Sequence, residues 1–373
     1  MNILHISPVV YLDRILRSFD LAHAQASMGH NVTIVGANDS RIVKKVNVNR
    51  RLRVYLLPSI NFPYTQRVSS ISYITGLPHF IKKIKPDIVH VQCHLNLTAV
   101  KSVITARDIP VPVVTTIHGV FSKINPLLDL AQLSYLYTIG GIIFKNSDRI
   151  ICLTKRDSYD LERFGCPSEK ISVVPNGVDI NLFRPRKESE KITVMWHGRF
   201  VASKGLDILV KAASKVIQKS CLDIKFVLVG DGPLKQKIMV MCEKLGITKD
   251  VMFVDRLPLD EVAQLLSRAS IYVLPSIKEG MPWALLEAMA CGKAVVASDI
   301  SGVNDIITHR ENGLLVPPKN IDAFTDAIIR LAEDVNLRKR LGRNARQLII
   351  KKYNWRIIAE RLESIYRKVV NKK

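Results

Sequence analysis

The sequence predicts an α/β protein built from two doubly wound domains, and three observations lead to this fold class. Short runs rich in β-branched residues alternate with helix-length segments along the 373 residues. Several of these runs are almost entirely apolar, which is typical of parallel strands covered on both faces. A charged stretch at 181–191 interrupts the alternation once, after which it resumes. We therefore expect one domain over residues 1–185 and a second over 186–353.

The first domain contains seven predicted strands. A helix predicted at 14–28 follows the first strand and ends at Gly29, the residue type best suited to a left-handed helix end. Alternation of this kind gives parallel sheets, because consecutive strands are joined by crossover helices. The strands are predicted at 2–6, 32–35, 54–57, 88–91, 113–117, 149–153 and 171–174.

The second domain repeats the pattern, with strands predicted at 192–196, 225–229, 251–254, 271–274 and 294–297. Open parallel sheets bind ligands at the carboxyl ends of their strands, so two such domains are expected to share a cleft there. At the end of the chain, apolar residues recur with the spacing of one helical face, which predicts an amphipathic helix. These residues are Ile358, Leu362, Ile365 and Val369.

The N-terminus, the longest apolar run and the cysteines indicate the cellular compartment of the protein. The opening residues enter an apolar strand directly, without the basic and long apolar regions of a secretion signal. The longest weakly charged run, 126–144, falls short of the roughly 20 apolar residues that a membrane span requires. The six cysteines form no metal-ligand or C-x-x-C pattern. We expect a cytoplasmic protein in a reducing compartment.

The net charge of +22 predicts attraction to anionic surfaces. Residues 336–373 hold thirteen Lys and Arg against Glu360 and Glu363, which is +11 of that total. A nucleic-acid-binding protein is one interpretation. Against it, the chain lacks a recognised nucleic-acid module, and its aromatic content is only 6%, which offers no evident stacking platform. We expect instead a peripheral association with the inner face of a membrane.

The stretch KEGMPWALLEAMA indicates a phosphate-binding loop. Pro282 suits the first helical position, and a helix N-terminus carries free N–H groups and the positive end of the dipole. Glu279 lies on the rim of this loop, and Glu287 lies further into the helix. A carboxylate accepts two hydrogen bonds from vicinal hydroxyls, as in ribose. The N–H groups expected to bind phosphate are those of Gly280, Met281 and Trp283.

Other loops carry complementary groups. In WHGRFVASKG, Gly198 follows a strand, and Arg199 and Lys204 could converge on a diphosphate. Gly230, in VGDGP, forms a tight turn after the next strand. His118 lies at the carboxyl end of a strand of the first domain, where a catalytic or a structural role is open.

Together these motifs resemble the retaining nucleotide-sugar glycosyltransferases of family 4. The resemblance covers nearly the whole chain and rests above all on EGMPWALLEAMACGKAVVASD with GRFVASKG. It implies the GT-B fold, in which two Rossmann-like domains face each other across a cleft and a C-terminal helix, here 354–373, crosses back to the N-terminal domain. It also implies that no metal or other cofactor is needed, in keeping with the absence of a D-x-D motif.

The resemblance also assigns roles. Arg199 and Lys204 would bind the donor diphosphate, Glu287 the ribose, and Glu279 would orient the sugar and stabilise charge during catalysis. His118 would reach the sugar from the opposite domain, as a second catalytic group. Backbone groups would hold the phosphate, the sugar and the base; these belong to Gly198, Gly230, Leu257, Gly280, Met281, Pro282 and Trp283.

One position departs from the family pattern. The family has a Gly-Gly pair in the loop after the first strand, where this chain has Leu12 and Asp13. An aspartate repels phosphate, so two interpretations stay open. The loop lies further away and shapes the acceptor pocket, with Asp13 acting on the acceptor hydroxyl, or donor transfer is impaired.

The predicted function is thus metal-independent, retaining transfer of a sugar from a UDP-, GDP- or ADP-sugar to an acceptor. The acceptor is expected to be a glycan or a lipid, including a lipid-linked glycan at the membrane surface. A sugar-nucleotide epimerase is the alternative on the same fold, and it would turn over donor without acceptor. The basic nucleic-acid-binding protein is the alternative of another class.

Overall fold

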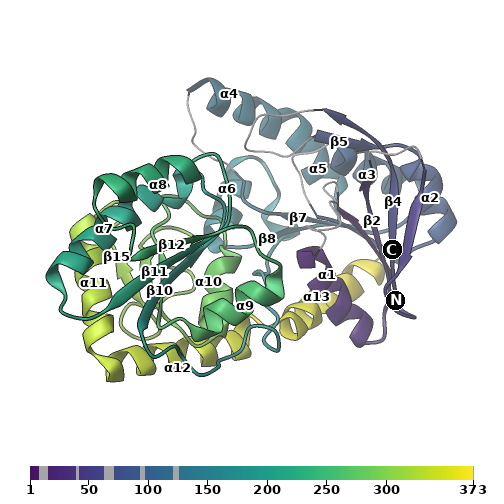
Figure 1. Ribbon diagram of the computed structural model, residues 1–373. Helices are drawn as coiled ribbons and strands as arrows, with labels where there is room; N and C mark the ends of the chain where they lie inside the picture. The colour runs from purple at the N-terminus through teal and green to yellow at the C-terminus, as the bar shows by residue number, and fades with distance from the viewer. Residues whose placement is uncertain (8–15, 39–41, 63–70, 93–96, 121–125, 373) are drawn as a thin grey trace. The chain divides into compact units, whose positions relative to one another are not determined.

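The structure is a computed structural model that describes residues 1–7, 16–38, 42–62, 71–92, 97–120 and 126–372. Its contacts divide the chain into two compact units. Unit 1 comprises Met1–Pro175 together with Trp355–Lys373, and unit 2 comprises Asn176–Asn354. Each unit contains one β-sheet packed against helices, as the alternation of apolar runs and helices predicts (Figure 1).

Unit 1 is built on a sheet in the order β3-β4-β2-β1-β6-β7-β8-β9, with β5 paired to β4. Its central strands are parallel and carry mostly apolar, buried residues, as two-sided coverage requires. The strands are β1 (Asn2–Ser7), β2 (Asn31–Asn38), β3 (Lys44–Asn47), β4 (Leu52–Phe62), β5 (Ile71–Ile74), β6 (Ile88–Val91), β7 (Val113–Ile117), β8 (Arg149–Cys152) and β9 (Ile171–Val173).

The expectation of purely parallel pairing is wrong at one side of this sheet. Strands β3 and β5 both pair antiparallel to β4. All four residues of β3 are exposed, so the strand has no buried face and lacks the apolar run by which the other strands are predicted. The helices of unit 1 are α1 (Leu16–Ser27), α2 (Leu77–Ile84), α3 (Leu97–Asp108), α4 (Pro126–Tyr135), α5 (Gly141–Asn146) and α6 (Lys155–Arg163).

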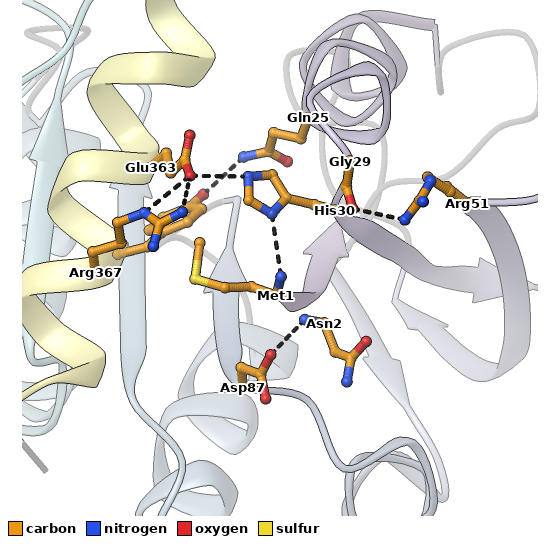
Figure 2. A network of polar contacts seen from close by, with 10 residues as sticks. Met1, Asn2, Gln25, Gly29, His30, Arg51, Asp87, Glu363 and Arg367 are labelled. Carbon is orange, nitrogen blue, oxygen red and sulfur yellow. Dashed lines mark hydrogen bonds and ion pairs between the residues drawn. The ribbon is translucent and has the colours of Figure 1, made fainter.

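The last helix, α13 (Trp355–Val370), belongs to unit 1 and packs beside α1 (Figure 1). Its apolar face is buried with residues of the first strands, as the spacing of its apolar residues predicts. Figure 2 shows the polar side of this contact, where Glu363 lies 3.4 Å from the His30 ring and accepts from Arg367 at 2.7 Å. The Met1 amino group lies 3.3 Å from the other nitrogen of His30.

Unit 2 has an all-parallel sheet in the order β12-β11-β10-β13-β14-β15. The strands are β10 (Ile192–His197), β11 (Ile224–Val229), β12 (Val251–Val254), β13 (Ile271–Leu274), β14 (Ala294–Ser298) and β15 (Leu314–Val316). The helices are α7 (Leu206–Lys219), α8 (Lys235–Lys244), α9 (Leu259–Arg268), α10 (Trp283–Ala290), α11 (Ile321–Glu333) and α12 (Val335–Lys352).

Residues 176–185, which we assign from sequence to the first domain, make their contacts within unit 2. Arg346 donates to the carbonyl oxygens of Ile180 and Phe183, and Val178 forms a bridge with Asn354. The segment carries no strand of either sheet, so the apolar pattern could not assign it. None of the described helices is long and apolar enough to cross a bilayer.

Candidate active site

The carboxyl edge of the unit 2 sheet is held together by direct contacts between loop backbones. The loop after β11 passes so close to the loop after β10 that a Cβ on Gly230 would lie 1.9 Å from the carbonyl oxygen of Gly198. Real Cβ atoms do not approach an oxygen so closely, so only glycine fits at Gly230. The two glycine loops that the sequence indicates are thereby brought together.

A second contact joins the loop after β13 to the loop after β14. Gly302 has a φ of +82°, and a Cβ there would lie 1.6 Å from the carbonyl oxygen of Gly280. Similarly, a Cβ on Gly205 would lie 2.1 Å from the carbonyl oxygen of Pro275, so the start of α7 contacts the end of β13. These approaches place the segment from Pro275 to Gly280 next to two neighbouring segments, the loop after β14 and the start of α7.

Glu279 and Lys204 meet at this edge. Lys204 Nζ lies 2.6 Å from Glu279 Oε1, and Ser276 Oγ donates to the same oxygen at 2.6 Å. The Glu279 side chain is 8% exposed and that of Lys204 is 25% exposed, so the carboxylate is the more enclosed partner. No residue that the structure describes donates to Glu279 Oε2. One oxygen of this carboxylate therefore serves the protein, and the other can accept from a ligand.

Glu287 is held differently. It lies in the second turn of α10, is buried, and its Oε2 lies 2.7 Å from His197 Nε2. His197 is the last residue of β10 and is also buried. His197 therefore holds the Glu287 carboxylate in one orientation.

The start of α10 differs from the sequence prediction. Pro282 is the N-cap, with an extended ψ of 116°, and the first helical residue is Trp283 rather than Pro282. The Pro282 carbonyl accepts the first helical bonds, from the N–H groups of Leu285 at 3.2 Å and Leu286 at 3.4 Å. Gly280 and Met281 therefore lie in the loop that leads into the helix.

Asn176 holds this loop. Its side-chain amide donates to the Met281 carbonyl oxygen at 3.1 Å, and its backbone N–H lies 3.1 Å from Met281 Sδ. The Asn176 side chain is buried, as is Met281. Asn176 thus anchors the predicted phosphate-binding loop.

The other predicted donor residues lie on the same side of unit 2. Arg199 is exposed and follows Gly198 in the loop after β10. Leu257 is half-buried in the segment between β12 and α9. The predicted donor residues thus lie in the segments that follow the carboxyl ends of β10, β11, β12 and β13, with Trp283 and Glu287 in α10 itself.

In unit 1, His118 directly follows β7 and is exposed at the carboxyl end of its strand, as predicted. Leu12 and Asp13 lie outside the described residues. Sequence reasoning missed His197, Ser276 and Gly302, which support the predicted residues. A histidine at the last position of a strand, immediately before Gly198, is the one signal that could have identified His197.

Comparison with known proteins identifies the family. The model of "Glycosyl transferases group 1" matches residues 178–348, and that of "Glycosyltransferase Family 4" matches residues 17–182. The UDP-Gal:alpha-D-GlcNAc-diphosphoundecaprenol alpha-1,3-galactosyltransferase of Escherichia coli is 30% identical over 82% of this chain and 81% of its own length. The chain belongs to glycosyltransferase family 4. Another relative of this family 4 enzyme, the N-acetyl-alpha-D-glucosaminyl L-malate synthase of Bacillus anthracis, is 28% identical over 69% of this chain and 68% of its own.

Solved structures confirm the GT-B fold of this family 4 glycosyltransferase. The sucrose-phosphate synthase of Thermosynechococcus elongatus covers 100% of both chains with a TM-score of 0.79 and 21% identity. Anabaena Alr3699/HepE, solved with UDP and glucose, covers 99% of this chain and 100% of its own with a TM-score of 0.77 and 18% identity. The family match and the Escherichia coli relative, and not these structures, make the chain a glycosyltransferase that uses a nucleotide sugar, and the epimerase alternative is not favoured.

Proposed function

We propose that this family 4 glycosyltransferase transfers a sugar with retention of configuration and without a metal ion, from a nucleotide diphosphate sugar bound at the carboxyl edge of unit 2. One observation carries the proposal. Glu279 is fixed through one oxygen by Lys204 and Ser276, while no described residue donates to its other oxygen. A cation for the diphosphate and an acceptor for a sugar hydroxyl thus lie in contact.

Lys204 and Arg199 supply the positive charge that the departing diphosphate requires. Breaking the bond at the anomeric carbon puts negative charge on the phosphate oxygen and positive charge on the sugar ring. Preorganised cations near that oxygen stabilise the transition state more than the ground state. Glu279 stabilises the ring charge electrostatically and orients the sugar, and His118 of unit 1 is proposed as the second group that contacts it.

Glu287 is proposed to bind the ribose hydroxyls. A buried carboxylate held by His197 has one fixed orientation, which lowers the entropy lost when two hydroxyls bind to it. We assign nucleotide binding to the backbone around Gly198, Gly230 and Leu257, and phosphate and sugar binding to the Gly280–Trp283 segment.

The proposed acceptor is a glycan or a lipid-linked glycan. The Escherichia coli relative is named for a diphosphoundecaprenol-linked acceptor, and three relatives are named for α-linked products or sugars. Retention gives an α-linked product from an α-linked donor. We propose a cytoplasmic enzyme that associates peripherally with an anionic membrane through its basic residues, since net positive charge is attracted to such surfaces.

A thermal-shift screen of UDP-, GDP- and ADP-sugars tests the donor site, because a ligand that binds only the folded state raises its apparent stability. We expect one nucleotide class to raise the melting temperature, and Glu287→Ala to abolish that shift. No shift with any of the three would contradict the donor assignment. Arg268→Ala, at the end of α9, provides a charge-removal control away from these loops.

A second experiment tests retention and metal independence with the donor that the screen identifies. Transfer is run with glycan and polyprenyl-diphosphate acceptors in the presence of EDTA, and the anomeric configuration of the product is read from its proton coupling by NMR. We expect activity in EDTA and an α-linked product. An inverted product, or activity that returns only with added Mg²⁺ or Mn²⁺, would overturn the respective part of the proposal.

Sedimentation with vesicles tests the membrane association. We expect more enzyme in the pellet with phosphatidylglycerol vesicles than with neutral vesicles, and less at 0.5 M salt, where charge attraction is screened. Removing the chain after residue 336 would delete α12 and α13, whose buried residues include Leu341, Ile349 and Leu362. Lysine-to-glutamine variants at the exposed C-terminal positions are therefore the better probe. Equal binding to both vesicle types would remove the membrane argument.

A further inference from the structure

Unit 2 contains a basic cavity that the donor site does not use. It lies where β14 begins, at the opposite end of the sheet from the donor loops, and has a volume of about 930 Å³. The segment 185–188, the turn between α10 and β14, and helices α11 and α12 surround it. Six of its lining residues are cationic: Arg330, Arg338, Lys339, Arg340, Arg343 and Arg346.

The floor of the cavity is formed where α12 approaches the turn between α10 and β14. A Cβ on Gly342 would lie 2.1 Å from the carbonyl oxygen of Gly292, so two glycines allow the helix to touch this backbone. Arg338, Gly342 and Arg346 follow one another at helical spacing on the face that this contact buries. The next row along the helix, which includes Lys339 and Arg343, is exposed.

The two inner arginines have structural roles. Arg338 Nη1 donates to the carbonyl oxygens of Leu331 at 2.6 Å and Ala332 at 3.0 Å, at the end of α11. Arg346 donates to the carbonyl oxygen of Ala290 at 2.7 Å, at the end of α10. The Arg338 side chain is 9% exposed, and its buried Nε has no hydrogen-bond partner in the described part of the chain. A buried N–H without an acceptor is unfavourable, which indicates a missing acceptor.

The acidic residues of the lining do not neutralise the outer arginines. Glu188 lies 3.4 Å from the buried Lys293, and Asp334 accepts from the N–H of Leu337 at 2.8 Å as the N-cap of α12. Within the described ranges, no carboxylate oxygen lies within 4.0 Å of a guanidinium nitrogen of Arg340 or Arg343. The cavity therefore combines unpaired guanidinium groups at its mouth with an unsatisfied guanidinium N–H in its wall.

We propose that this cavity is a second anion site, which binds a phosphate- or diphosphate-bearing ligand. Guanidinium groups bind phosphate oxygens with two parallel hydrogen bonds, and a volume near 900 Å³ accommodates a drug-sized ligand. The cavity contains no residue of the donor loops, because its lining residues lie toward the amino-terminal end of the sheet. The phosphate could belong to a soluble metabolite or to a lipid head group.

Binding of inorganic pyrophosphate to the full-length enzyme, measured by calorimetry, tests the proposal. Arg340→Gln/Arg343→Gln should weaken the binding at least about tenfold, since hydrogen bonds to charged groups contribute about 1.5–3 kcal/mol and 1.4 kcal/mol is tenfold. Lys351→Gln/Lys352→Gln removes two exposed charges from the last turn of the same helix and should leave the affinity unchanged. Equal weakening by both pairs would overturn the proposal, because it would show a non-specific charge effect.

The donor site also binds phosphate in our proposal, so Lys204→Ala is measured in parallel. Two classes of pyrophosphate site, of which Lys204→Ala removes only one, would support the second site. A single class lost in Lys204→Ala and kept in Arg340→Gln/Arg343→Gln would overturn it, as would the absence of any pyrophosphate binding. Failure of the donor screen leaves these outcomes unaffected, because no nucleotide is used.

Vesicles distinguish the two sources of phosphate. If the ligand is a lipid head group, phosphatidic acid vesicles should compete with pyrophosphate, and Arg340→Gln/Arg343→Gln should reduce their binding more than Lys351→Gln/Lys352→Gln does. If it is soluble, pyrophosphate binding should persist in the presence of the vesicles. Vesicle binding that both variant pairs reduce equally would exclude the lipid source.

Discussion

Unit 2 brings its functional loops together through contacts between backbones, whereas unit 1 attaches its last helix through hydrogen bonds between buried side chains. In unit 2, glycines allow the loops after β10, β11, β13 and β14 to touch at the carboxyl edge of the sheet. In unit 1, Tyr366 of α13 contacts both His90 of β6 and Gln25 of α1, and Gln25 in turn lies 2.7 Å from His5 of β1. All four of these side chains are buried.

Because the two units are held together differently, their polar side chains have different roles. In unit 2 the backbone contacts hold the loops together, so charged side chains such as Lys204 and Glu279 are not needed for that purpose. They lie at the carboxyl edge of the sheet, where we propose that the donor binds. The polar groups of unit 1 saturate one another inside the core, as buried polar groups must. Two similar folds thus place polarity at a binding edge in one unit and inside a structural joint in the other.

The largest expected effect breaks the backbone contact in unit 2. Gly302→Ala should destabilise the fold by about 3–5 kcal/mol, because it adds a clash with the Gly280 carbonyl to the strain of a left-handed residue. Gly246→Ala is the matched control, since it also has a positive φ but has open space around its Cβ, and it should cost only about 1–2 kcal/mol. Chemical denaturation measures both. Equal losses would show that the contact is unimportant.

Glu279→Gln should lower the transfer rate by about 10²–10³-fold, the loss typical of a preorganised electrostatic group. The amide keeps the shape but loses the charge that pairs with Lys204. Nucleotide binding by thermal shift should persist, because Glu287 is unchanged. Steady-state kinetics measure the effect, and a rise in KM with an unchanged kcat would argue for a role in binding alone.

In unit 1 the buried joint should be sensitive to acid. Burial lowers the pKa of His5 from 6.5 to about 4, and that of the adjacent His90 is also lowered by burial and by the neighbouring His5 and His118. The unfolded chain therefore binds more protons between these values. The stability contributed by His5 is full above pH 6.5 and is lost as the pH falls toward 4, by up to about 3 kcal/mol.

Melting temperatures of the wild type between pH 8 and pH 4.5 measure this loss. His5→Gln should flatten the dependence, and His79→Gln, at an exposed position, is the matched histidine removal. A dependence that is the same in the wild type and in His5→Gln would contradict the assignment.

The smallest expected effect is that of Tyr366→Phe. It removes the hydroxyl that contacts both His90 and Gln25 while keeping the ring in the core. Leaving buried partners unsatisfied costs about 1–3 kcal/mol, so the midpoint of denaturation should fall modestly. Tyr159→Phe removes an exposed hydroxyl for comparison and should leave the midpoint unchanged. If both variants behave alike, the joint is held by its apolar contacts.

The sequence by itself determined which segments form the central strands and which loops carry the donor residues. Residues 88–91, 113–117 and 271–274 are strands with the predicted bounds, because a strand covered on both faces needs an apolar run that the sequence alone reveals. It could not reveal β3, all of whose residues are exposed, since no buried face imposes a pattern on it.

Only the tertiary structure decided which polar residues meet. Lys204 and Glu279, His197 and Glu287, and His90 and Tyr366 are far apart in the chain, and each pair forms because packed strands and helices bring their ends together. The sequence marks Glu279 and Glu287 as unusual through their shared loop and helix. Their different partners follow from contacts between distant segments, which no local pattern encodes.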